Sequence, residues 1–83
     1  MITDGTELTK LVCSNIRKIR KEKGMTQVKA SERLGVSRQQ FALFENGTRM
    51  PRPQNLCDIA QVLSCNVLDF YKELDSETKE SLE

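Results

Sequence analysis

LGVSRQQFALFENG, residues 34–47, decides the fold, because it contains the end of one helix, a turn and a complete second helix. Gly35 favours a helix stop, and Ser37 followed three residues later by Gln40 is a capping box that favours a new helix start. Asn46–Gly47 then supplies two residue types that tolerate the left-handed conformation in which helices often end. The sequence therefore predicts two short helices joined by a tight turn.

The helix predicted after Ser37 has an apolar face and a polar N-terminus. Phe41 and Phe44 fall on one face at helical spacing, whereas Arg38 and Gln39 point elsewhere. Arginine and glutamine form bidentate hydrogen bonds with guanine and adenine edges in the DNA major groove. Simple solvent exposure would also explain these two side chains, but their place at the start of this helix favours contact with bases.

Apolar residues also recur at three- and four-residue spacings on both sides of this stretch, which is the pattern of helices. The pattern, read with its Thr, Gly, Pro and Asn boundaries, predicts four further helices. They cover about residues 7–23, 27–34, 53–63 and 66–74. Because no credible strand is present, the expected fold is an all-α bundle of five helices.

The 83 residues are near the lower limit for a self-sufficient core, so we expect one domain, residues 7–74. We expect residues 1–6 to be a flexible N-terminus and residues 75–83 to be an acidic C-terminal tail, either helical or frayed. The net charge is only +1, but residues 1–53 hold eleven Lys/Arg and five Asp/Glu, whereas residues 54–83 hold two and seven. This asymmetry indicates a basic working face and an acidic far end, although two solvated helix surfaces would also produce it.

The three cysteines include no C-x-x-C pair, and the chain has no histidine. A zinc site, another metal site or a disulfide framework is therefore not expected, nor is any cofactor. Cys57 and Cys65 lie at apolar-periodic positions and are expected in the core, which leaves Cys13 as the thiol nearest the surface. We find no nucleophile paired with a base, which argues against an enzyme. Without a signal peptide or a long apolar run, the protein is expected in the cytoplasm rather than in a membrane.

With these residues in view, the chain resembles the phage-repressor and Cro type of helix-turn-helix domain, also called the Xre family. The resemblance runs from about Asn15 to Phe70. It is carried by Ile16-Arg17-Lys18-Ile19-Arg20, Gly24-Met25-Thr26-Gln27, Leu34-Gly35-Val36-Ser37, Phe44-Glu45-Asn46-Gly47, Ile59-Ala60 and Leu63.

The resemblance implies a lambda-repressor-like fold in which residues 26–46 form the motif, the first helix crossing the phosphate backbone and the second lying in the major groove. It implies base contacts by Arg38, Gln39 and Leu43, although Leu43 could instead add to the core. It implies contacts with the DNA backbone by Gln27, Ser37, Gln40, Asn46, Thr48, Arg49 and Arg52. Gln27 would also brace the start of the recognition helix, which is the helix that follows Ser37. Arg20 and Glu45 would form a buried ion pair between the helix predicted over residues 7–23 and the recognition helix.

The chain departs from the family pattern in its core. Ala30 and Ser31 stand where Leu-Ala is usual, so the second helix offers less volume. Phe41 stands where Ile or Val is common, and we interpret it as a compensating replacement.

The last predicted helix carries more apolar side chains than it needs to bury within one subunit. The surplus favours a two-fold dimer interface formed by Val67, Leu68, Phe70, Tyr71 and Leu74. The function expected is that of a sequence-specific regulator of transcription, a dimeric repressor on a palindromic double-stranded DNA operator. The alternative is an antitoxin or anti-regulator of the same fold that binds a small protein partner through its acidic helices.

Overall fold

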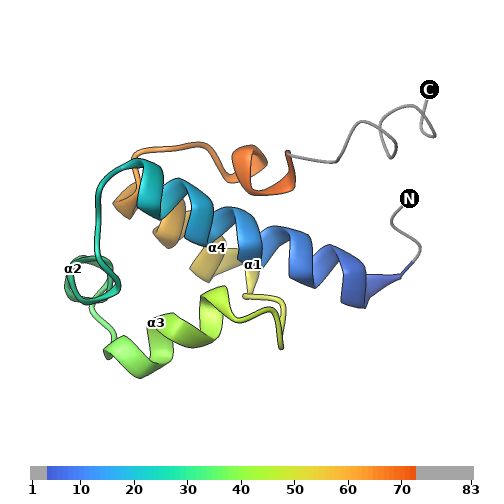
Figure 1. Ribbon diagram of the computed structural model, residues 1–83, viewed down its shortest axis with the longest axis horizontal. Coiled ribbons are helices and arrows are strands. Elements are labelled where there is room, and N and C mark those ends of the chain that lie inside the picture. Colours follow the sequence, from blue (N-terminus) through green and yellow to red (C-terminus); the bar gives the residue numbers. More distant parts are fainter. Residues whose placement is uncertain (1–3, 73–83) are drawn as a thin grey trace.

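The computed structural model describes residues 4–72 of the 83-residue chain. These residues form no strand, so the all-α class is confirmed. The five-helix count is not confirmed, because the last element is a 3-10 helix of five residues rather than a fifth α-helix. The elements are α1 (Gly5–Glu22), α2 (Gln27–Leu34), α3 (Arg38–Glu45), α4 (Pro53–Val62) and the 3-10 helix η1 (Val67–Tyr71) (Figure 1).

The helices α1, α2 and α3 each begin after a side chain that accepts a hydrogen bond from an otherwise unpaired backbone amide, whereas α4 begins at Pro53 without such a bond. Thr26 Oγ1 accepts from Lys29 N at 3.0 Å, and this bond starts α2 at the predicted residue. The carboxylate of Asp4 accepts from Glu7 N at 2.9 Å. As a result α1 begins at Gly5, two residues before the predicted start. Residues 5 and 6 are therefore helical, although they were predicted to belong to a flexible N-terminus of residues 1–6.

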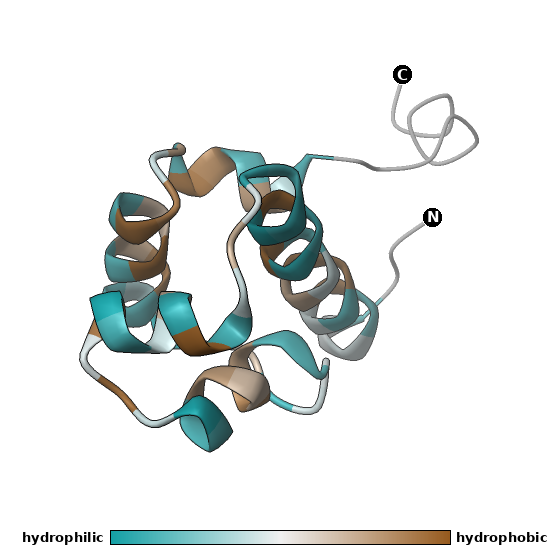
Figure 2. Cartoon of the chain, turned by 60° about the vertical axis from the view of Figure 1, so that its left-hand side comes forward, coloured by the Kyte–Doolittle hydropathy of each residue, from teal (hydrophilic) through white to brown (hydrophobic). Residues whose placement is uncertain are grey.

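The core forms where the other elements pack around α1. Figure 1 shows η1 on one side of α1, α3 on the other and α4 behind it. In Figure 2 each helix carries both hydrophobic and hydrophilic residues, so each has one side for the core and one for solvent. The buried hydrophobic cluster consists of Val12, Ile16, Ala30, Phe41, Phe44, Leu56, Ile59, Ala60, Leu63 and Phe70.

The prediction for the cysteines was wrong for Cys13 and Cys57, whereas Cys65 packs against the core as predicted. Cys13 is fully buried, Cys57 is exposed and Cys65 is half-buried. The thiol of Cys13 donates a hydrogen bond to the carbonyl oxygen of Arg49 at 3.6 Å, which ties α1 to the loop after α3. Burial raises the pKa of the Cys13 thiol, and the negative charge of Glu45 adds to this effect. Cys13 is therefore a structural residue.

The end of η1 is held by a side chain that the sequence analysis did not single out. The buried Asn15 donates from Nδ2 to the carbonyl oxygens of Phe70 and Lys72, at 2.7 Å each. Phe70 is thereby drawn into the core and is fully buried. Its predicted place in a dimer interface is wrong, because its ring already fills space within one subunit. Leu68 remains exposed on η1, and Leu74 lies outside the described residues.

Candidate nucleic-acid interface

The corner between α2 and α3 is set by hydrogen bonds of the backbone. Gly35 adopts φ +82°, a left-handed conformation that glycine reaches without steric cost. Its amide and the amide of Val36 both donate to the carbonyl oxygen of Ser31, at 2.9 and 3.0 Å, and end α2. Ser37 Oγ then accepts from Gln40 N at 3.0 Å and starts α3. The hydroxyl oxygen of Ser37, predicted to contact the DNA backbone, therefore accepts the capping bond, and its O–H group is left to donate to a phosphate.

The short helix α3 separates its residues cleanly between core and solvent. Phe41 and Phe44 are buried and meet edge to face, with ring centroids 6.2 Å apart. Arg38 and Gln39 are exposed at the N-terminus. Leu43 is 52% exposed, so it lies on the outer face and does not add to the core. The three side chains predicted to contact bases therefore share the solvent side of α3.

The ion pair expected between Arg20 and Glu45 is formed and buried. Arg20 Nε lies 2.6 Å from Glu45 Oε2, and its Nη2 donates to Oε1 at 3.2 Å. The two residues are only 6% and 8% exposed. Arg20 Nη1 also donates to the carbonyl oxygen of Met25 at 2.7 Å. The pair thus connects α1, the start of α2 and the end of α3.

Gln27 extends this ion pair to the surface. Its Nε2 donates to Glu45 Oε1 at 2.9 Å, and its Oε1 accepts from Arg38 Nη1 at 3.2 Å. The amide of Gln27, predicted to reach a phosphate, therefore bridges the buried carboxylate and Arg38. Sequence reasoning predicted that Gln27 braces the start of α3 but missed its bond with Arg38. The available signal was the pairing of a glutamine and an arginine at the starts of two adjoining helices.

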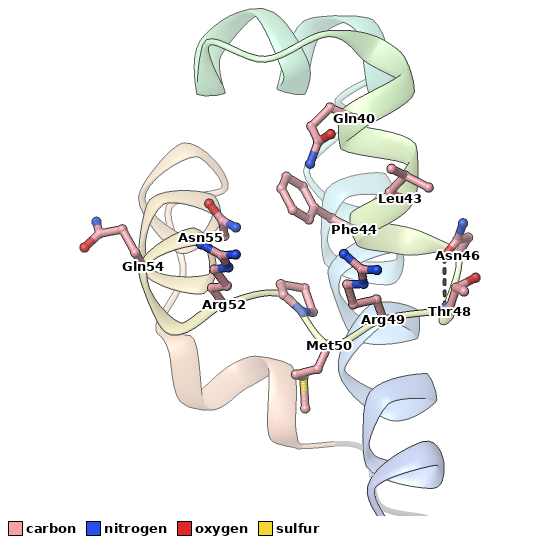
Figure 3. A pocket seen from close by; sticks show the side chains of 11 residues that line it. Gln40, Leu43, Phe44, Asn46, Thr48, Arg49, Met50, Arg52, Gln54 and Asn55 are labelled. Carbon is pink, nitrogen blue, oxygen red and sulfur yellow. Dashed lines mark hydrogen bonds between the residues drawn. The ribbon is translucent and has the colours of Figure 1, made fainter.

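A groove of about 660 Å³ runs between α3, the following loop and the start of α4 (Figure 3). Figure 3 shows Gln40 and Phe44 pointing from α3 toward α4, and Arg52 beside Asn55. Among residues 4–72, no acidic side chain lines the groove, so its two arginines make it favourable for anions. Its lining consists of Gln40, Leu43, Phe44, Asn46, Thr48, Arg49, Met50, Pro51, Arg52, Gln54 and Asn55.

The loop that carries the two arginines begins with a compact turn. Asn46 Oδ1 accepts from Thr48 N at 2.9 Å, and Gly47 adopts φ +81°. The residues predicted to contact the DNA backbone therefore fall into two groups. Gln40, Asn46, Thr48, Arg49 and Arg52 surround the groove, whereas Gln27 is the first residue of α2 and Ser37 lies at the α2–α3 corner.

Nowhere in residues 4–72 do three or more potential metal-binding side chains gather. None of the helices in this part of the chain combines the length and apolar character needed to cross a bilayer.

Comparison with known proteins gives a consistent result. A helix-turn-helix family model matches residues 16–70. The chain is 35% identical over 69 residues to the uncharacterized HTH-type transcriptional regulator y4dJ of Sinorhizobium fredii, covering 83% of this chain and 90% of that protein. It is 32% identical over 65 residues to the uncharacterized HTH-type transcriptional regulator YqaE of Bacillus subtilis, covering 78% of this chain and 55% of YqaE. The chain thus spans about half the length of YqaE.

Two solved structures share the fold. The clp gene regulator ClgR from C. glutamicum superposes with a TM-score of 0.72 at 24% identity, covering 76% of this chain and 82% of ClgR. The hypothetical transcription factor NHTF from Neisseria gives a TM-score of 0.74 at 19% identity, covering 100% of this chain and 93% of that one. Together with the family match, the α2–α3 corner and the outward-facing N-terminus of α3 identify this chain as a member of the Xre/Cro-type helix-turn-helix family of DNA-binding transcriptional regulators.

Proposed function

We propose that the protein is a sequence-specific repressor that binds a palindromic operator as a dimer. In this proposal α3 lies in the major groove, where Arg38 and Gln39 contact base edges and Leu43 contacts a thymine methyl group. The helix α2 crosses the phosphate backbone. Phosphates are bound by Gln27, Ser37, Gln40, Asn46, Thr48, Arg49 and Arg52.

One observation carries the proposal: α3 exposes its polar N-terminus while Glu45 at its other end is anchored in the protein interior. Within residues 4–72, the side chain of Arg38 is bonded only through Nη1 to Gln27, which leaves its other N–H groups to donate to a guanine edge. Gln39 is exposed, and its side chain forms no hydrogen bond within the same residues. A recognition helix that is held in position before binding loses less conformational entropy when it meets DNA, which favours affinity.

The groove supports the same assignment, because Arg49 and Arg52 supply positive charge beside the C-terminal end of α3. Bonds from such side chains to phosphates position a protein on DNA but do not select a sequence. They also make binding dependent on salt, since each neutralised phosphate releases condensed counterions. We therefore expect the logarithm of the affinity for the operator to fall linearly with the logarithm of the salt concentration.

The test of the proposal is selection of binding sites from random duplexes. The expected product is a palindrome whose half-sites lie about one helical turn, roughly 10 base pairs, apart. Recovery of unrelated sequences, with equal affinity for each, would contradict sequence-specific recognition.

Replacing Gln39 by alanine is expected to weaken binding to the selected operator by roughly 1–3 kcal/mol, about 5- to 150-fold, because alanine cannot hydrogen-bond a base edge. The preference for one base pair in each half-site should relax at the same time. The measurement is titration of the operator and its single-base variants.

Two variants serve as comparisons for Gln39. Gln61→Ala removes an exposed glutamine from α4 and should leave binding unchanged. Arg49→Gln should weaken binding to all duplexes alike, because a bond to a phosphate carries no base preference. If Gln39→Ala also weakened all duplexes alike, its assignment as a base-contacting residue would be wrong.

We infer that dimerisation uses η1, where Leu68 is 68% exposed next to the exposed Tyr71 and the half-buried Val67. A leucine so exposed on a short anchored element is explained if a second subunit covers it. Replacing Leu68 by glutamate should therefore convert the dimer to a monomer in sedimentation experiments, because a charge at the centre of the interface would be buried unpaired. Val28→Glu, at a valine 50% exposed on α2, should leave the dimer intact. A wild-type protein that sediments as a monomer with and without operator would exclude the dimer.

A further inference from the structure

The first half of α1 lies outside the segment that matches the helix-turn-helix family. The match begins at residue 16, whereas α1 begins at Gly5, so eleven residues of the helix precede it. In Figure 1 this part of α1 continues past the C-terminal end of α3 and the loop that follows it. An extension of this kind adds surface beside the proposed DNA-binding groove.

Two contacts place one side of this extension against the loop after α3. Lys10 lies beside Gly47, its Cγ 3.6 Å from the position that a Cβ on Gly47 would occupy. One turn later, Cys13 Sγ donates to the carbonyl oxygen of Arg49 at 3.6 Å. The opposite side of α1 faces η1, since Asn15 donates to carbonyl oxygens of that element. Lys10 therefore borders the loop that carries Thr48 and Arg49.

Lys10 is also the first residue of a basic stripe along this edge of the helix. We define the α1 basic stripe as Lys10, Ser14, Arg17 and Lys21, spaced by four, three and four residues and therefore on one face. All four residues are exposed. The side chains of the three cations form no hydrogen bond or ion pair with residues 4–72. Their charges are available to a polyanion.

We propose that Lys10 binds a DNA phosphate next to those bound by Thr48 and Arg49, so that the extension of α1 is a second backbone-binding segment. The proposal rests on the proposed function, because it requires α3 to lie in the major groove. It goes beyond it by assigning a phosphate to a residue outside the family-matched segment. The added bond raises affinity without base preference.

The test compares wild-type protein with Lys10→Gln, Lys10→Arg and Lys23→Gln on the selected operator. Glutamine keeps the Cβ and Cγ that lie beside Gly47 and removes only the charge, whereas arginine keeps the charge. Lys23→Gln is the matched control, because Lys23 follows the same helix but its Nζ lies 3.5 Å from the carbonyl oxygen of Ser64, toward η1. Affinity is measured against salt concentration, and on duplexes in which single phosphates are replaced by uncharged methylphosphonates.

The slope of log affinity against log salt is negative, and Lys10→Gln is expected to make it less steep by about 0.9 for each phosphate that it no longer binds, while the other two variants keep the wild-type slope. A methylphosphonate at one position per half-site should weaken DNA binding by the wild type and by Lys10→Arg, but not by Lys10→Gln. This inference alone would be overturned if Lys10→Gln had the same salt slope as Lys23→Gln and its binding were weakened by the same methylphosphonate positions as wild-type binding. A wild-type protein that shows no sequence-selective binding would overturn the proposed function and this inference together.

Discussion

Replacing Arg20 by methionine is expected to lower the free energy of unfolding by roughly 3–5 kcal/mol, because it leaves the buried carboxylate of Glu45 without its counter-charge. Arg20 supplies two hydrogen bonds to Glu45 and one to the carbonyl oxygen of Met25. After the replacement, Gln27 would be the one remaining side-chain donor to Glu45 within residues 4–72. The measurement is urea denaturation followed by circular dichroism.

Two further variants separate the loss of the buried ion pair from a general loss of positive charge. Arg33→Met removes an exposed arginine from α2 and is expected to change stability by less than about 1 kcal/mol. The double variant Arg20→Met/Glu45→Leu should recover most of the lost stability, since no charge is left buried and unpaired. A loss for Arg20→Met no greater than that for Arg33→Met would show that the ion pair contributes little to folding.

The features that sequence analysis predicted well are those decided within one helical turn. Thr26 and Ser37 cap helices three residues before the amides they bind, and Gly35 ends α2 in a left-handed conformation. Such signals depend on neighbours along the chain alone, so they can be read without knowing the fold. The exposure of Arg38 and Gln39 follows from the same register, because the caps and the two phenylalanines orient α3.

The features that it missed depend on which elements meet in space. Asn15 reaches carbonyl groups more than fifty residues away and buries Phe70, so the surplus of apolar residues after Asn66 was overestimated. The same long-range packing buries Cys13 under the loop after α3 and leaves Cys57 outside the apolar stripe of α4. Periodicity shows that a helix has an apolar face, but it leaves open which residues at the edge of that face a neighbour will cover.

Replacing Phe41 by alanine is expected to cost roughly 3–5 kcal/mol of unfolding free energy, because it removes a fully buried ring and leaves a cavity. The replacement also removes the edge-to-face packing of this ring on Phe44. Leu43→Ala is the control, since Leu43 lies on the same helix but is 52% exposed. Equal midpoints of urea unfolding for the two variants would contradict a core role for Phe41.

The size of Phe41 is interpreted as compensation for the small Ala30, and a double-mutant cycle tests this interpretation. Both residues are fully buried in the same cluster, on adjoining helices. Ala30→Leu alone should overfill the site and cost about 1–3 kcal/mol, and Phe41→Val alone should leave it underfilled. If the two residues share one space, the double variant should lose less stability than the sum of the single variants. Simple additivity would show that the volumes at the two positions are set independently, each by its own neighbours.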